Sequence, residues 1–110
     1  MAGSYRVTVR EGARVSHERF ASFDGALDAV EERGRELSRG ARAKPVDTKV
    51  LGRWEPRQQV AARLQLGRRG GVDIRGDGSA EAYTGWLRRR LVEQQDDESP
   101  YDALRRVLGS

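Results

Sequence analysis

The sequence predicts a two-layer α+β domain, in which helices cover one face of an antiparallel sheet of about five strands. Apolar and polar residues alternate over 5–10 and 58–66, which predicts strands because successive side chains of a strand point to opposite faces. Between them, an apolar stripe with spacings of four and three predicts a helix. The stripe consists of Phe23, Leu27, Val30, Gly34 and Leu37.

The first part of the chain is typical of a hairpin followed by this helix. A turn at 11–13 joins the strand at 5–10 to a return strand at 14–20. Ser22 is a good N-cap for the helix, and Gly40 is a natural C-terminal stop. Gly34, inside the stripe, indicates close packing of the helix against the sheet.

Three further strands are predicted in the middle of the chain. Alternating residues over 46–51 and 58–66 indicate a pair of strands, and the loop at 52–57 connects them. A glycine-rich turn at 67–71 then leads into a short strand at 72–75. Short connections of this kind imply antiparallel pairing.

Two helices are predicted at the C-terminal end. Asp77 or Ser79 can cap a helix over 80–92, and Ser99 followed by Pro100 predicts a shorter helix over 100–108. The expected order is β-β-α-β-β-β-α-α. Residues 1–94 should form one domain, and 95–110 an acidic hinge and a short helix. That helix could dock on its own domain or on another chain.

Positive charge is concentrated in the middle of the chain. Residues 33–69 hold eleven Arg or Lys and three acidic residues, a net charge of +8, whereas 1–32 and 70–110 each have a net charge of −2. Arginine outnumbers lysine nineteen to two, which is typical of a GC-rich bacterial coding sequence, so genomic bias explains part of it. The uneven distribution nevertheless indicates an anionic partner, most often nucleic acid.

The candidate nucleic-acid-binding residues lie in this basic region. In the loop at 52–57 an indole between two arginines could stack on a base while the cations contact phosphates, or it could pack in the core instead. The arginine pair between glycines at 67–71 suits phosphate contact, or forms a solvated turn. The candidates are Arg53, Trp54, Arg57, Arg63, Arg68 and Arg69.

Residues suited to catalysis are few. His17 is the only histidine, and without cysteine the chain has no thiol nucleophile, disulfide or thiolate metal site. Adjacent acidic residues such as those at 96–98 rarely converge on a metal ion without ligands from elsewhere. We therefore expect a protein that is not an enzyme, with no catalytic residues, no metal site and no cofactor.

The chain has no apolar run long enough to span a membrane, and its N-terminus lacks the apolar stretch of a signal peptide. These features predict a cytoplasmic protein without a membrane partner.

From 23 to 94 the expected order α-β-β-β-α resembles double-stranded-RNA-binding-like folds and the bacterial ribosome hibernation-promoting factors. The stretch 57–92 looks most like the latter, with 58–66 as the central strand, 72–75 as the last strand, and 80–92 as a second helix that carries Arg88, Arg89 and Arg90. The resemblance implies binding to the small ribosomal subunit through basic residues on helices and loops. It includes no diagnostic motif, and the N-terminal hairpin departs from the family pattern.

The leading expectation is a non-catalytic RNA- or ribosome-binding module, whose arginines should lie on one contiguous face. The alternative is a protein-interaction or assembly module, either a homo-oligomer or a subunit of a bacterial complex. Such a module should show an apolar patch on the last helix or an open sheet edge. The candidate partner-binding residues are Tyr101, Leu104, Val107 and Leu108.

Overall fold

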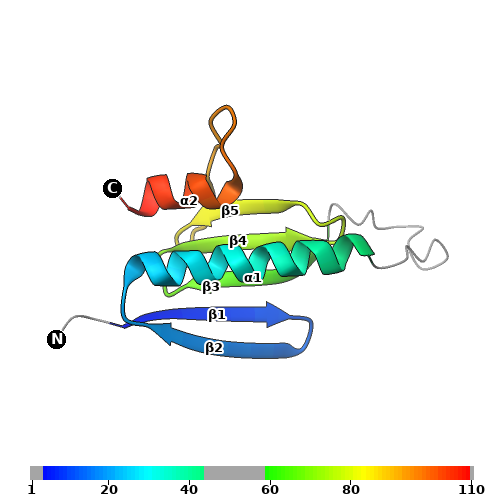
Figure 1. Ribbon diagram of the computed structural model, residues 1–110, viewed down its shortest axis with the longest axis horizontal. Coiled ribbons are helices and arrows are strands. Elements are labelled where there is room, and N and C mark those ends of the chain that lie inside the picture. The colour runs from blue at the N-terminus through cyan, green and yellow to red at the C-terminus, as the bar shows by residue number, and fades with distance from the viewer. Residues whose placement is uncertain (1–3, 44–58, 110) are drawn as a thin grey trace.

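The computed structural model describes residues 4–43 and 59–109. In these ranges, six strands form one antiparallel sheet in the order β2-β1-β3-β4-β5-β6, and two helices pack on one of its faces (Figure 1). The elements are β1 (Tyr5–Glu11), β2 (Arg14–Phe20), α1 (Phe23–Ala43), β3 (Val60–Leu66), β4 (Gly70–Arg75), β5 (Ala80–Thr84), β6 (Arg90–Leu91) and α2 (Pro100–Leu108). The predicted two-layer α+β class is confirmed.

The N-terminal hairpin and the start of α1 are also confirmed. A two-residue turn joins β1 to β2, and Gly12 adopts a φ of 60° there, which costs a glycine little. The Ser22 hydroxyl accepts a hydrogen bond from the Gly25 amide at 2.9 Å and so caps α1. The predicted stop at Gly40 is wrong, because α1 continues to Ala43. A glycine inside a helix weakens it without ending it.

The hydrophobic core lies between the sheet and the two helices. α1 runs along the sheet over β3 and β4 (Figure 1) and also contacts β1. Its apolar stripe covers the alternate residues of these strands that face it. The largest fully buried side chains are Val30, Leu64, Leu66, Val72, Ile74 and Leu104. No described helix covers the opposite face of the sheet, which we call the open face.

The predicted helix over 80–92 is wrong, because this segment forms β5, a turn and β6. Asp77, expected as a helix cap, accepts hydrogen bonds from the amide and the hydroxyl of Ser79 in the turn between β4 and β5. An Asx turn and a helix cap use the same local bond, so the sequence signal does not separate them. At Gly85 the backbone reaches a φ of 87°, which interrupts a helix. The residues likened to a family's second helix are therefore strands.

The short helix α2 forms as predicted, and it packs on the sheet of its own chain. The Ser99 hydroxyl accepts a hydrogen bond from the Asp102 amide at 3.0 Å, Pro100 occupies the first turn, and Gly109 follows the last helical residue. The helix packs on β4 and β5 and touches α1. It is therefore part of the same core as the rest of the described chain.

This docking corrects the prediction that the apolar face of α2 binds a partner. Tyr101 and Leu104 are buried within the chain, and Leu108 is partly buried against the core. Only Val107 of the four candidates counts as exposed. An apolar face that already covers its own sheet is not available to another protein in this arrangement.

The predicted strand at 46–51 and the loop at 52–57 lie outside the described residues. Within the described residues, neither helix is both long and apolar enough to cross a bilayer.

Candidate nucleic-acid interface

Three segments meet at one end of the sheet, which lies on the left in Figure 1. They are the start of β1 (4–6), the turn between β3 and β4 (67–69) and the turn from β5 into β6 (85–90). The Gly67 amide donates a hydrogen bond to the Arg6 carbonyl at 2.9 Å, and the Gly85 amide donates one to the Arg69 carbonyl at 2.8 Å. We call these three segments the basic end.

The basic end carries a concentrated positive charge. Its three segments contain six arginines and no acidic residue, a net charge of +6. All six side chains are exposed. They are Arg6, Arg68, Arg69, Arg88, Arg89 and Arg90.

Of the eleven described arginines outside the basic end, six are compensated by ion pairs. In the described part of the chain, the arginines that form ion pairs are Arg33, Arg35, Arg63, Arg75, Arg105 and Arg106. None of these belongs to the basic end, and no arginine of the basic end forms an ion pair with a described acidic residue. The charge of the basic end is therefore free to attract an anion.

Aromatic rings hold several of these cations in place. The Arg68 guanidinium lies 4.9 Å from the centre of the Trp86 ring, and the Arg69 guanidinium lies 5.1 Å from Phe23 and 5.6 Å from Tyr5. Such stacking uses the face of a guanidinium and leaves its edge N–H groups available as donors. A shallow hollow of about 390 Å³ lies beside these arginines, between them and the start of β1.

Trp86 is the largest exposed aromatic side chain described. It is 47% exposed, and it stands next to Leu87, which is 82% exposed. Sequence reasoning missed Trp86 because it assigned this residue to a helix. The tripeptide Thr84-Gly85-Trp86, with a glycine directly after a segment of strand-forming residues, could have indicated a turn with an exposed indole.

The predicted site residues do not all come together. Arg68 and Arg69 lie at the basic end, but Arg53, Trp54 and Arg57 are outside the described residues.

Arg63 is placed differently from the expectation for a phosphate-binding residue. It lies on the open face and makes two hydrogen bonds to the carboxylate of Asp73, at 2.7 and 3.2 Å, directly across the β3–β4 pair. The bond to Asp73 raises the pKa of Arg63. A guanidinium held by a carboxylate in two bonds is a poor phosphate ligand, because phosphate must displace that partner.

Tyr83 lies beside Arg63 on the same face, and arginines cover its ring. The Arg63 and Arg89 guanidinium groups lie 6.0 and 5.4 Å from the ring centre. Burial, with a smaller contribution from Asp73, raises the pKa of Tyr83 to about 12. Arg89 thus connects the basic end to the open face of the sheet.

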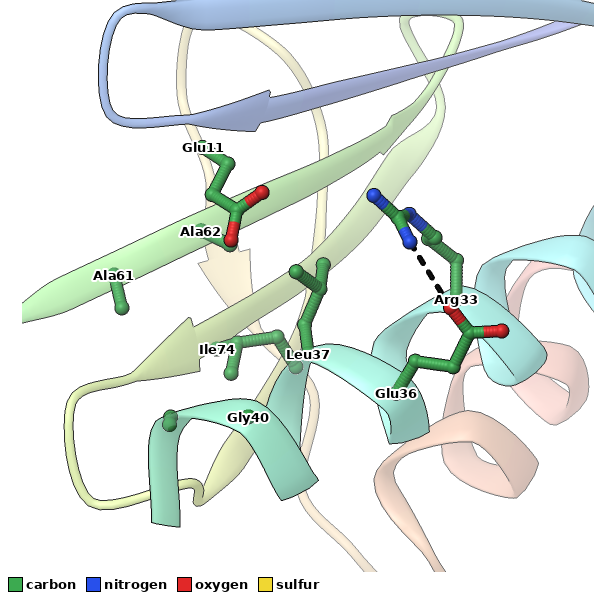
Figure 2. Close-up of a pocket in the computed structure, with 9 residues that line it drawn as sticks. Glu11, Arg33, Glu36, Leu37, Gly40, Ala61, Ala62 and Ile74 are labelled. Carbon is green, nitrogen blue, oxygen red and sulfur yellow. Dashed lines mark hydrogen bonds and ion pairs between the residues drawn. The ribbon is translucent and has the colours of Figure 1, made fainter. Parts of the chain in front are cut away.

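A second hollow lies far from the basic end, between the C-terminal half of α1 and the sheet (Figure 2). It has a volume of about 250 Å³, and its charged lining residues are Glu11, Arg33 and Glu36. Figure 2 shows Arg33 directed at Glu36, and the two form an ion pair at 2.9 Å. The rest of the lining is Leu37, Ile74 and small residues, with no nucleophilic side chain.

Metal-ligating side chains do not gather anywhere in residues 4–43 and 59–109, where no three His, Asp or Glu residues could hold one ion together. His17 lies on the open face near β1, and its Nδ1 is 3.1 Å from the Arg6 guanidinium and 3.0 Å from the Thr8 hydroxyl.

Comparison of the chain with known protein families, characterised proteins and solved structures gives no match.

Proposed function

We propose that this protein binds single-stranded RNA through the basic end. The observation that carries the proposal is the set of six exposed arginines at one end of the sheet, without acidic partners among the described residues, together with the exposed Trp86, on which Arg68 stacks. Phosphates supply most of the attraction in nucleic-acid binding, and aromatic side chains supply stacking for unpaired bases. The basic end carries both kinds of group.

The arginines would contact the phosphates. Arg68 and Arg69 project from a short turn, and their guanidinium groups lie against aromatic rings, so less side-chain entropy is lost on binding. Planar guanidinium groups donate two parallel hydrogen bonds to a phosphate. Arg88, Arg89 and Arg90 add positive charge where the chain enters β6, and Arg89 lies over the Tyr83 ring on the open face.

Trp86 would stack on a base. Arg68 covers part of its ring system, and about half of the side chain remains exposed. An unpaired base can lie on the uncovered part of the indole, whereas a base in a duplex is already stacked on its neighbours. The proposal therefore favours single strands over duplexes, and it includes exposed single-stranded segments of ribosomal RNA.

Fluorescence anisotropy with a labelled single-stranded RNA tests the proposal. Between about 50 and 500 mM salt, the logarithm of the affinity should fall by about 0.7 per phosphate contacted for each tenfold rise in salt, or about 3 for four contacts. Trp86→Ala should weaken binding by about tenfold or more, because stacking contributes about 1–3 kcal/mol per base. A duplex of the same sequence should bind more weakly.

A matched pair of double variants separates the basic end from net charge. Arg68→Glu with Arg69→Glu should abolish most binding and flatten the salt dependence. Arg10→Glu with Arg39→Glu changes the net charge equally at exposed residues outside the basic end, and should have a much smaller effect. Equal losses in the two double variants, or no binding at low salt, would refute the proposal.

Trp54, the indole first expected to stack, can be compared directly with Trp86. Loss of binding in Trp54→Ala but not in Trp86→Ala would move the base contact away from the basic end.

A further inference from the structure

Among the described strands, β2 lies at an edge of the sheet with no strand on its outer side, and it lacks several of the usual defences against pairing. It has seven residues, of which the first six are exposed, and it pairs with β1 without a bulge. It contains no proline and no lysine, which commonly protect edge strands, and its charged residues Arg14, Glu18 and Arg19 include both signs. Val15, at 43% exposure, is a large apolar side chain on this edge.

The hairpin geometry determines which backbone groups of β2 face outward. Glu11 and Arg14 flank a two-residue turn, so they form a hydrogen-bonded pair, and such pairs alternate along an antiparallel ladder. Arg14, Ser16 and Glu18 therefore bond inward to β1. The outward amides and carbonyls belong to Val15 and His17, and to Arg19 beyond them.

We propose that β2 pairs with β2 of a second copy of this chain, antiparallel, about a two-fold axis at Ser16. In this register, Arg14 of each copy lies opposite Glu18 of the other copy. The two-fold axis therefore generates two such pairs. It also places the outward-facing Val15 opposite the outward-facing His17, so the ladder hydrogen bonds can form. The two sheets become one continuous sheet.

Charge complementarity selects this register over its neighbours. Arg14 and Glu18 share one face of β2, and neither has an ionic partner among the described residues. With the axis at His17, Arg14 would face Phe20 and Glu18 would face Ser16. With the axis at Glu18, two carboxylates would face each other. Of these three registers, only the axis at Ser16 places Arg14 opposite Glu18.

Charge reversal tests the pairing in protein freed of nucleic acid, by light scattering and sedimentation over a concentration series. Arg14→Glu or Glu18→Arg alone turns two attractive pairs into two repulsive ones, and should raise the dimer dissociation constant about tenfold or more. The double variant Arg14→Glu/Glu18→Arg should restore the dimer. An equimolar mixture of the two single variants should also dimerise, because their charges are complementary.

A cysteine scan reads the register, because the chain has no native cysteine. Ser16→Cys places two thiols opposite each other at the axis, in a pair that is not hydrogen-bonded, where the Cα atoms are about 4.5 Å apart. Mild oxidation should crosslink Ser16→Cys readily and the matched controls Arg14→Cys and Glu18→Cys poorly. Preferred crosslinking of Glu18→Cys would overturn the proposed register.

Proline substitution tests the backbone pairing of the two β2 strands independently of the ion pairs. Val15→Pro removes an amide that faces outward and leaves the bonds to β1 intact, so it should give a folded monomer. Overturning results would be a native chain that stays monomeric at the highest soluble concentration, or a dimer unaffected by both Val15→Pro and the single charge reversals. RNA binding at the basic end is a separate measurement, and its failure would leave this result unchanged.

Discussion

Replacing Gly34 with alanine should destabilise the protein, although alanine is the better helix former. A Cβ atom at Gly34 would lie 2.8 Å from both Cε1 and Cζ of Tyr101, closer than such atoms approach without movement. Tyr101 is only 4% exposed, so its ring has little room to move. The substitution therefore forces α2 away from α1.

The magnitude follows from two opposed effects. Overpacking of a filled core costs about 1–3 kcal/mol, and exchange of a helical glycine for alanine returns about 0.5–1 kcal/mol. The net loss in the free energy of unfolding should be about 1–2 kcal/mol. For a domain of this size, that lowers the melting temperature by about 4–8 °C.

Gly40 provides the matched control in the same helix. An added Cβ at Gly40 meets nothing within 4 Å, so Gly40→Ala should stabilise the protein by about 0.5–1 kcal/mol. In a Tyr101→Leu background the obstructing ring atoms are gone, and Gly34→Ala should then behave like Gly40→Ala. Urea denaturation of the single and double variants measures the coupling. Equal effects of the two alanine substitutions in the native background would refute this account of α2 docking.

Two further predictions concern the docked helix and the open face. Arg105 links α2 to α1 through Glu31 at 2.6 Å and Asp28 at 2.7 Å, so Arg105→Gln should lower the free energy of unfolding by about 1–2 kcal/mol at neutral pH. Burial raises the pKa of Glu31, but hydrogen bonds from Arg35 and Arg105 outweigh burial and hold this pKa below its usual 4.5. The ionised Glu31 therefore stabilises the fold above pH 4.5, and this stabilisation is lost in acid. Denaturation curves of Arg105→Gln and of the native protein should accordingly converge as the pH falls. The buried Tyr83 hydroxyl has no hydrogen-bond partner among the described residues, so Tyr83→Phe should leave stability unchanged or raise it by up to about 1 kcal/mol, and a loss above that in urea denaturation would contradict this. Because burial raises the pKa of Tyr83 from 10.0 to about 12, native stability should fall as the pH rises through this range, and Tyr83→Phe should reduce that fall.

Much of the fold was predictable because local signals and tertiary packing agree. The alternation in β1 and β3, the Ser22 cap of α1 and the Ser99-Pro100 start of α2 all describe elements that form as expected. In each case the residues that face the core are also the residues that the local pattern marks as apolar. A sequence predicts an element correctly where its local pattern and the tertiary packing favour the same structure.

The failure at 80–92 has a local cause. Ala80, Tyr83, Leu87 and Leu91 have helical spacing, but in the structure Ala80 packs against the core, Tyr83 lies on the open face, and Leu87 and Leu91 are largely exposed. Pairing of β5 with β4 uses backbone bonds that a helix would keep within itself, and Gly85 permits the turn that follows. An apolar spacing is evidence for a helix only if the same residues become buried.

The sequence predicted the kind of ligand that the candidate site would bind, but not all of the residues that form the site. The sequence indicated an anionic partner and named Arg68 and Arg69. It also named Arg63, which the structure pairs with Asp73, and it overlooked Trp86. Whether an arginine is available depends on which acidic residue lies across the sheet, and strand register decides that.

By itself, the sequence determined the two-layer class, the hairpin, the N-caps of α1 and α2 and the positive charge of the chain, because these depend on residues close together along it. Only the tertiary structure decided that 4–6, 67–69 and 85–90 meet at one end of the sheet, that α2 covers its own core, and that β2 is the outermost of the described strands on its side. These outcomes depend on the order of the strands. The strand order depends on how segments far apart in the sequence bury their apolar surface together, so no single segment is sufficient to predict it.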